Sequence, residues 1–196
     1  MDDALTHTRA QLCADFLELD QLYSELFQQC SREQLLWRPS NGGWSIAECT
    51  EHVARANSQY LPPIKVAIAK GGQPAPAHDY LFSPGGWFSA VFLKRIGPQV
   101  TMKFKAPRKI RPLSVEPEQA FQELRRGHIE IQELLAATAQ QDLNRIRFKN
   151  PFIPILHFTV ATGFLIMAAH GRRHLEQAQG LKTMAGFPNT KAQQSA

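Results

Sequence analysis

The sequence predicts an all-α protein, an up-down four-helix bundle with one long insertion between the second and third helices. Four stretches carry apolar residues at helical spacing, capping residues precede them, and the long stretch 71–116 instead holds proline, glycine and aromatic residues. Helices with one apolar seam bury it by packing together. The 196 residues, 43% of them hydrophobic, suffice for one sizeable core. We expect a single domain over 1–185 and a flexible tail over 186–196.

The first helix is expected to open at Asp2 or Thr6 and to run to about Gln29. A short helical turn follows the Ser31 cap, and Pro39 ends it. The apolar seam of the first helix is formed by Leu12, Phe16, Leu19, Tyr23, Leu26 and Cys30.

Ser45 and Glu48 have the S-x-x-E spacing of a capping box, which predicts the start of the second long helix. His52 lies at the edge of its apolar seam and is expected to point inward. Because Pro62 and Pro63 interrupt the pattern, we expect residues 64–70 to be kinked or to form a separate turn. The seam consists of Ile46, Cys49, Val53, Ala56 and Tyr60.

The insertion 71–116 is expected to cross the bundle, with a short amphipathic helix at 86–96 inside it. No acidic residue lies between Tyr80 and Val115. This segment has three interpretations: a solvated basic loop, a guide for an anionic substrate, or a nucleic-acid surface. Its basic residues are Lys94, Arg95, Lys103, Lys105, Arg108, Lys109 and Arg111.

The third helix is predicted over 118–140, opened by Pro117 at its first position. His128 occupies its apolar seam, where it is either a hydrogen-bonded core residue or a helper beside a site. Thr159 is the expected cap of the fourth helix. The uncharged run 152–169 reaches the length at which a membrane span is considered, but its proline and polar residues favour a buried bundle helix.

Cysteine usage and the N-terminus indicate a cytoplasmic protein. Cys13, Cys30 and Cys49 are widely spaced and odd in number, which predicts neither a disulfide framework nor a C-x-x-C metal site. The acidic start of the chain is not typical of a signal peptide. The net charge of +5 is too small by itself to indicate nucleic acid.

His170 and His174 lie four residues apart, so on a helix both imidazoles reach a common point. This pattern alone is also compatible with ordinary core or surface histidines. The bundle places His52 opposite the pair, and three imidazoles from two helices occupy three corners of a tetrahedron. A fourth position then stays open for water or substrate. Such a site accepts zinc, nickel or iron(II), zinc and nickel being favoured over iron.

Two segments resemble the DinB-like (YfiT-like) superfamily of metal-binding four-helix bundles. The segment 43–53, G-W-S-I-A-E-C-T-E-H-V, is similar to the family's G-W-S-x-x-E-x-x-x-H opening of the second helix. The N-P at 150–151, the Thr159 cap and H-G-R-R-H-L-E-Q at 170–177 are similar to its ending, and the resemblance covers most of 11–179. It implies that His52, His170 and His174 are the metal ligands. The long basic insertion departs from the family pattern.

The resemblance implies a metal site more firmly than a reaction, because characterised relatives include thiol S-transferases and proposed metal-dependent hydrolases. We expect a small-molecule substrate, for example a low-molecular-weight thiol such as glutathione, bacillithiol or mycothiol. His128 and Glu48 are candidate catalytic helpers, although Glu48 also serves the capping box. The alternative is a non-enzymatic, stress-related protein that binds metal or nucleic acid. A homodimer is plausible for the family.

We further expect the insertion to cover the open coordination position, where its cations would hold an anionic substrate. The residues assigned to this role are Lys103, Lys105, Arg108 and Lys109.

Overall fold

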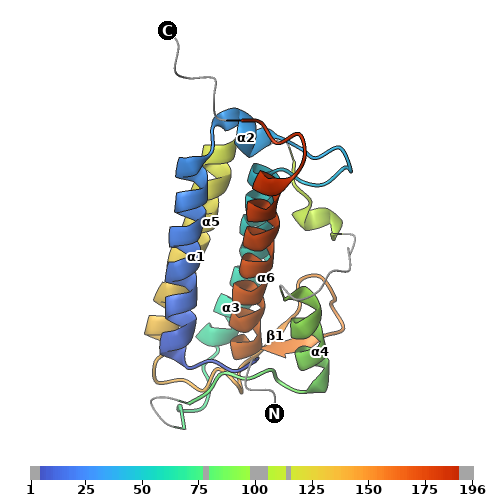
Figure 1. Ribbon diagram of the computed structural model, residues 1–196. Helices are drawn as coiled ribbons and strands as arrows, with labels where there is room; N and C mark the ends of the chain where they lie inside the picture. Colours follow the sequence, from blue (N-terminus) through green and yellow to red (C-terminus); the bar gives the residue numbers. More distant parts are fainter. Residues whose placement is uncertain (1–4, 77–79, 98–105, 114–115, 190–196) are drawn as a thin grey trace.

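The computed structural model describes residues 5–76, 80–97, 106–113 and 116–189, and it is mostly helical (Figure 1). This confirms the all-α fold. The elements follow in the order α1 (Arg9–Gln29), α2 (Arg32–Leu36), α3 (Ile46–Ala69), α4 (Trp87–Ile96), the 3-10 turn η2 (Arg108–Ile110), α5 (Pro117–Ala137), β1 (Arg147–Lys149), β2 (His157–Thr159), α6 (Val160–Gly180) and the 3-10 turn η3 (Leu181–Thr183).

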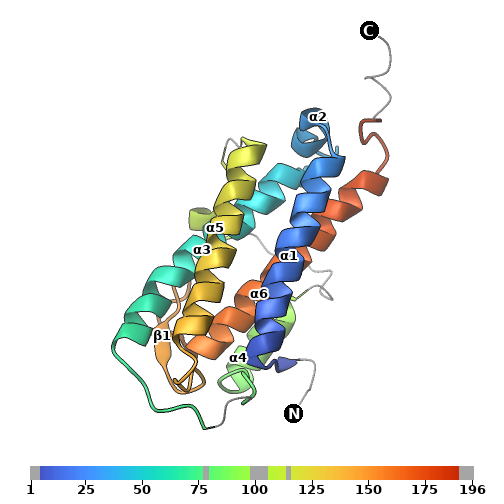
Figure 2. The same ribbon diagram turned by 90° about the vertical axis from the view of Figure 1, so that its left-hand side faces the viewer.

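The four long helices α1, α3, α5 and α6 form the bundle, with α3 and α1 each packed against both α5 and α6 (Figures 1 and 2). The chain runs up α1, down α3, down α5 and up α6 (Figure 1). Thus α3 and α5 are parallel, and strict up-down alternation holds only within the two halves. The insertion between α3 and α5 is the connection that returns along the length of the bundle.

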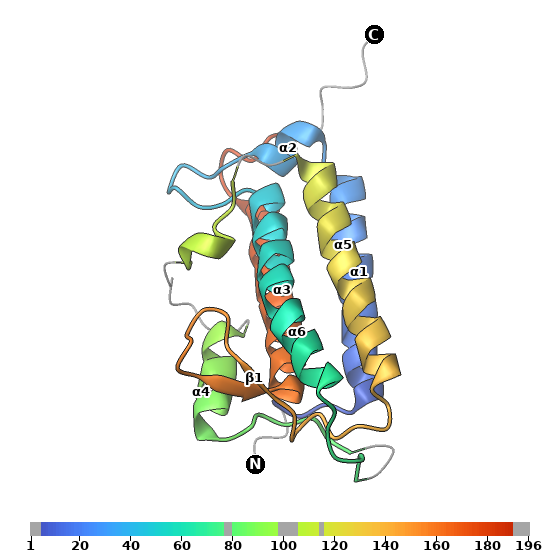
Figure 3. The same cartoon turned by 180° about the vertical axis from the view of Figure 1, so that it is seen from behind.

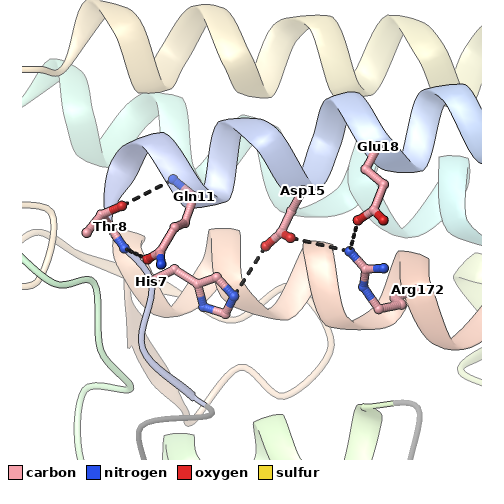
Figure 4. A network of polar contacts seen from close by, with 6 residues as sticks. All are labelled: His7, Thr8, Gln11, Asp15, Glu18 and Arg172. Carbon is pink, nitrogen blue, oxygen red and sulfur yellow. Dashed lines mark hydrogen bonds and ion pairs between the residues drawn. The ribbon is translucent and has the colours of Figure 1, made fainter.

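The helix starts follow their capping residues. The predicted boxes at Ser31 and Ser45 and the Thr159 cap are confirmed. The expected opening of the first helix at Thr6 is wrong: Thr8 is the cap, with its hydroxyl accepting from the Gln11 amide while the Gln11 side chain accepts from the Thr8 amide (Figure 4). The earlier alternative, Asp2, lies outside the described residues.

Helix α3 continues without interruption through Pro62 and Pro63, so the expected separate turn is wrong. A proline removes one hydrogen bond to the carbonyl four residues earlier. The carbonyls concerned belong to Ser58, which is exposed, and Gln59, which is half-buried. The helix therefore loses its bonds on a side that water reaches, while Leu61 and Ile64 stay buried in the core.

The bundle core is built from the predicted seams, and Gly163 of α6 allows close contact at the α3–α6 interface. A Cβ atom at Gly163 would lie 2.9 Å from the Ile64 Cδ1 atom and 2.9 Å from the Phe148 Cε1 atom. Phe148 belongs to a two-stranded antiparallel hairpin of β1 and β2, which the helical pattern did not predict. Helix α5 ends at Ala137, three residues before the predicted end, because Thr138 adopts a cap conformation and its hydroxyl donates to the Leu134 carbonyl.

The insertion lies against the bundle in its described parts. Helix α4, predicted at 86–96, packs against α6, and η2 packs against α3 (Figures 1 and 3). Phe82 exchanges two backbone hydrogen bonds with His7, just before α1. Lys103 and Lys105 lie outside the described residues.

Two residues of the expected tail, 187 and 188, are packed against the bundle. The Phe187 ring contacts Trp37 at 5.4 Å between centroids, and the Gln34 amide donates to the Pro188 carbonyl over 2.8 Å. These contacts hold 187–188 against α2 and the residue after it, whereas 190–196 lie outside the described residues.

Within the described part of the chain, no helix has both the length and the apolar character to cross a membrane. The run 152–169 is divided between the hairpin and α6. Cys13, Cys30 and Cys49 are free. A cytoplasmic location stays a prediction.

Candidate metal centre

The three predicted ligands meet at the α3–α6 interface. His52 comes from the second turn of α3, where the Ser45–Glu48 capping box sets the start of the helix. His170 and His174 come from successive turns of α6. One ligand atom from each ring lies within 4.8 Å of the other two. Among the described residues, this is the group of histidine, cysteine and acidic side chains that could hold a metal ion.

The distances fit a divalent ion. The Nε2 atoms of His52 and His170 are 3.2 Å apart, and the ring centroids of His52 and His174 are 4.5 Å apart. Zinc–nitrogen bonds of about 2.0–2.1 Å at tetrahedral angles put two ligand nitrogens about 3.3 Å apart. In the metal-free chain a neutral His170 with its proton on Nε2 donates to His52 Nε2 at this distance, whereas with both Nε2 atoms unprotonated a cation between them would accept both lone pairs.

Hydrogen bonds orient two of the three rings. His52 Nδ1 lies 2.6 Å from the Ile110 carbonyl oxygen, which only accepts, so Nδ1 carries the proton and Nε2 has its lone pair free. His174 Nδ1 donates in the same way to Gln177 Oε1 over 3.0 Å. A partner on the second ring nitrogen is what fixes a metal-binding histidine in other metal sites.

Burial keeps the imidazoles neutral. It lowers the pKa of His52 to about 4 and that of His174 to about 3, and it holds the pKa of His170 well below the ordinary value. The neighbouring imidazoles lower the pKa of His170 further, and Arg173 lowers those of His170 and His174. Neutral imidazole is the form that binds metal.

Trp44 covers one side of the centre. Its ring centroid lies 4.6 Å from that of His52 and 5.9 Å from that of His174. The residue directly precedes the Ser45 cap, so the same turn that starts α3 also places the indole. The ring gives the centre an apolar wall that restricts access of water.

The orientation of α6 is fixed from the side of α1 (Figure 4). Arg172 lies between the two histidines in sequence, and it makes ion pairs with Asp15 at 3.3 Å and Glu18 at 2.7 Å. A Cβ atom at Gly171 would lie 3.2 Å from the Leu19 Cδ1 atom, so the two helices approach closely there. These contacts turn the face of His170 and His174 toward α3.

The predicted helpers have partners of their own. His128 is buried, with Nδ1 2.6 Å from Asp20 Oδ1 and its ring 5.3 Å from that of Phe16. Glu48 closes the capping box on the Ser45 amide and forms an ion pair with Arg38. These contacts explain both side chains without catalysis, and a helper role for either stays a prediction.

Sequence reasoning assigned no role at the centre to three of its neighbours: Trp44 and Gln177, which lie inside the motifs quoted for the family, and the Ile110 carbonyl. Gln177 could have been found, because it follows His174 by three residues on the same helix. The Ile110 carbonyl could not have been found from the sequence, because every residue has a backbone carbonyl and this one comes from a distant loop.

Comparison with protein families decides the assignment. The model of the DinB superfamily matches residues 16–178, a span that contains all three histidines. The chain belongs to the DinB superfamily. A search of curated proteins and a search of solved structures gave no match. Membership agrees with the resemblance noted from the sequence, and with a three-histidine group that could hold a metal ion.

Replacing His52 with alanine should lower metal affinity as much as His170→Ala, because both rings would be direct ligands from facing helices. Metal content after gel filtration, measured by elemental analysis, checks this. His157→Ala is the control, since that exposed histidine lies outside the cluster. A His52→Ala protein that retains one tightly held ion would contradict the shared site.

The lowered pKa values set the direction of a pH effect. The folded pKa of about 4 for His52 lies below the ordinary 6.5, so the unfolded chain binds more protons between these values. The contribution of these neutral, buried histidines to the free energy of unfolding is therefore fully present above pH ~6.5. It is lost as pH falls toward the folded pKa values. Metal-loaded protein should melt higher than metal-free protein at about pH 8, and the gap should close over roughly pH 6 to 4 as protons displace the ion. Equal melting curves at every pH would contradict metal binding.

Proposed function

We propose that this DinB-superfamily protein is a metal-dependent enzyme of the thiol S-transferase or hydrolase type. The observation that carries the proposal is the convergence of three neutral imidazoles, two of them oriented by hydrogen bonds from their Nδ1 atoms. His52, His170 and His174 would hold a divalent ion. Zinc and nickel fit this donor set best, and iron(II) is compatible with it.

A divalent ion bound by neutral ligands keeps its full charge, so it lowers the pKa of a thiol or water and supplies a nucleophile near neutral pH. The residues of the chain contribute position and shielding. The Ile110 carbonyl and Gln177 hold the protons of two rings on the side away from the cluster. Trp44 keeps water from one side.

The surroundings of the centre favour an anionic substrate. Arg173 lowers the pKa values of His170 and His174, and Arg55, which also pairs with Glu51 at 3.6 Å, lowers that of His52, so both guanidinium groups add positive potential at the cluster. Cations beside a cation site oppose metal binding but attract a thiolate or a carboxylate. Low-molecular-weight thiols carry such groups, so they are the substrate class that we infer.

Residues 106–113 of the insertion, termed the clamp, contact α3 beside the metal centre. The Ile110 carbonyl accepts from His52, and the Lys109 carbonyl accepts from the Arg55 guanidinium over 3.0 Å. The Leu113 amide donates to Glu51 Oε2 over 2.9 Å. These contacts hold the clamp on α3 on both sides of Ile110. Three exposed cations of the clamp, Arg108, Lys109 and Arg111, flank Ile110, whose carbonyl contacts His52.

The central test is turnover. Metal-loaded protein should consume a low-molecular-weight thiol in the presence of an electrophilic acceptor, or hydrolyse an ester or amide, and chelation or His174→Ala should lower kcat by at least about a hundredfold. Loss of free thiol and release of product are the measurements, with glutathione, bacillithiol and mycothiol as donors. His157→Ala serves as the folded control. Equal rates with and without metal would contradict an enzymatic centre.

The clamp gives a second test. Replacing Arg108 and Lys109 together with glutamine should raise KM for an anionic thiol several-fold, because two cations beside its carboxylates are lost, while metal content stays unchanged. Arg125→Gln with Lys182→Gln is the charge-matched control, since both cations are exposed on other elements. An unchanged KM would remove the clamp from substrate binding. Replacing Lys103 and Lys105 with glutamine as well should raise KM in the same direction.

The basic insertion also supports a second candidate function, contact with nucleic acid through phosphate. It predicts DNA binding that weakens steeply with salt and survives removal of the metal. The enzymatic proposal predicts neither.

A further inference from the structure

A second concave site lies at the far end of α3, between that helix, the chain that follows it and β1. We call it the hairpin groove. Its volume is about 680 Å³, within the range of about 300–1,000 Å³ that is usual for small-molecule sites. Its apolar floor is formed by Pro63, Val66, Ala67, Ile146 and Phe148.

The rim of the groove is cationic. Among the described residues, no aspartate or glutamate lines it. Arg145 forms an ion pair with Asp142 at 3.3 Å and bonds Gln73, and Arg147 donates to the His157 carbonyl over 3.3 Å. The cations of the rim are Lys70, Arg145, Arg147 and Lys149, and His157 lies beside them.

Structural contacts account for part of this charge, because Arg145 is held by Asp142 and Gln73, and Arg147 donates to the His157 carbonyl. Lys70 caps the C-terminus of α3, where a positive charge is favourable. Arg147 and Lys149 instead lie on the outer face of β1, and Lys149 pairs directly with His157 across the hairpin. This cross-strand pair adds neither an apolar contact nor an opposite charge to the hairpin. Their convergence on a groove with an apolar floor therefore points to a ligand.

We propose that the hairpin groove binds a small organic phosphate with an apolar body. Guanidinium groups can donate two parallel hydrogen bonds to the oxygens of a phosphate. Lysine ammonium groups attract the phosphate charge from many directions. The floor would take an aryl or alkyl part, which inorganic phosphate lacks. The ligand class follows from this combination of charge and apolar surface.

The groove is separate from the metal centre. His52 and Lys70 are 18 positions apart along α3, which at about 1.5 Å per residue corresponds to about 27 Å. Binding there is independent of the proposed function, and the two are tested separately.

The probe is 1-naphthyl phosphate, titrated calorimetrically into the metal-loaded full chain. Saturable binding of one molecule per chain is expected, with affinity at least about tenfold above that of 1-naphthol or inorganic phosphate. Arg147→Gln with Lys149→Gln on β1 should weaken binding at least about tenfold. Lys70→Gln, at the end of α3, should also weaken binding. The double variant Arg125→Gln with Lys182→Gln should bind like the parent. Thermal melts of each variant establish that it is folded.

Three results would overturn the proposal: absence of saturable binding, unchanged affinity in the folded Arg147/Lys149 variant, or equal affinity for 1-naphthol or inorganic phosphate. Loss of binding in His174→Ala would assign the probe to the metal centre instead, which also overturns it. Vesicles containing phosphatidic acid distinguish a lipid source. Sedimentation with vesicles but no binding of dispersed probe would make the rim a membrane contact and exclude the small ligand.

Discussion

The packing of α3 against α6 is the constraint on which the metal centre depends. One imidazole comes from α3 and two from α6, so the cluster exists only in one register of these helices. A slip of a single turn, about 5.4 Å, exceeds the 3.2 Å between the Nε2 atoms of His52 and His170. Gly163 lets Ile64 and Phe148 pack closely at the interface, and Arg172 fixes the rotation of α6 through Asp15 and Glu18. Packing and ion pairs far from the ligands thus determine whether the ligands meet.

The protein surrounds the centre with neutral ligands and positive side chains, so the charge needed for chemistry would come from a bound metal ion. The ligands are neutral, and burial lowers their pKa values so that they stay neutral well below pH 7. Arg173, and to a smaller extent Arg55 in its ion pair with Glu51, add positive potential around the position that a metal ion would occupy. Arg55 also holds the clamp and pairs with Glu51, but in a purely structural metal site such positive neighbours would weaken the hold on the ion. They are useful where an anion must approach the ion, and they support the enzymatic proposal over a structural one.

The sequence was sufficient for the parts governed by local patterns. Helical spacing and the caps at Ser45 and Thr159 predicted the long helices, and the same spacing placed His52 opposite His170 and His174. Where long-range contacts compete with local propensity, the prediction was incomplete. Pro62 and Pro63 remain inside α3 because the lost bonds lie on the side of Ser58 and Gln59, and this depends on which side of α3 the tertiary packing covers. Ile110 orients His52 through its backbone carbonyl, which tertiary folding brings to the ring. Residue types alone could therefore not predict this contact.

The parallel direction of α3 and α5 explains why the insertion lies where it does. Helix α3 ends at the opposite end of the bundle from the start of α5, so the connection must return along the whole molecule (Figure 1). On this return path it passes α6 as α4 and then reaches α3 beside His52, where Ile110 orients the ring. A short connection could not do this, because it would join antiparallel neighbours at one end of the bundle. The topology therefore brings a segment rich in cations to a centre built from neutral ligands, and it leaves the far end of α3 free to form the hairpin groove with β1.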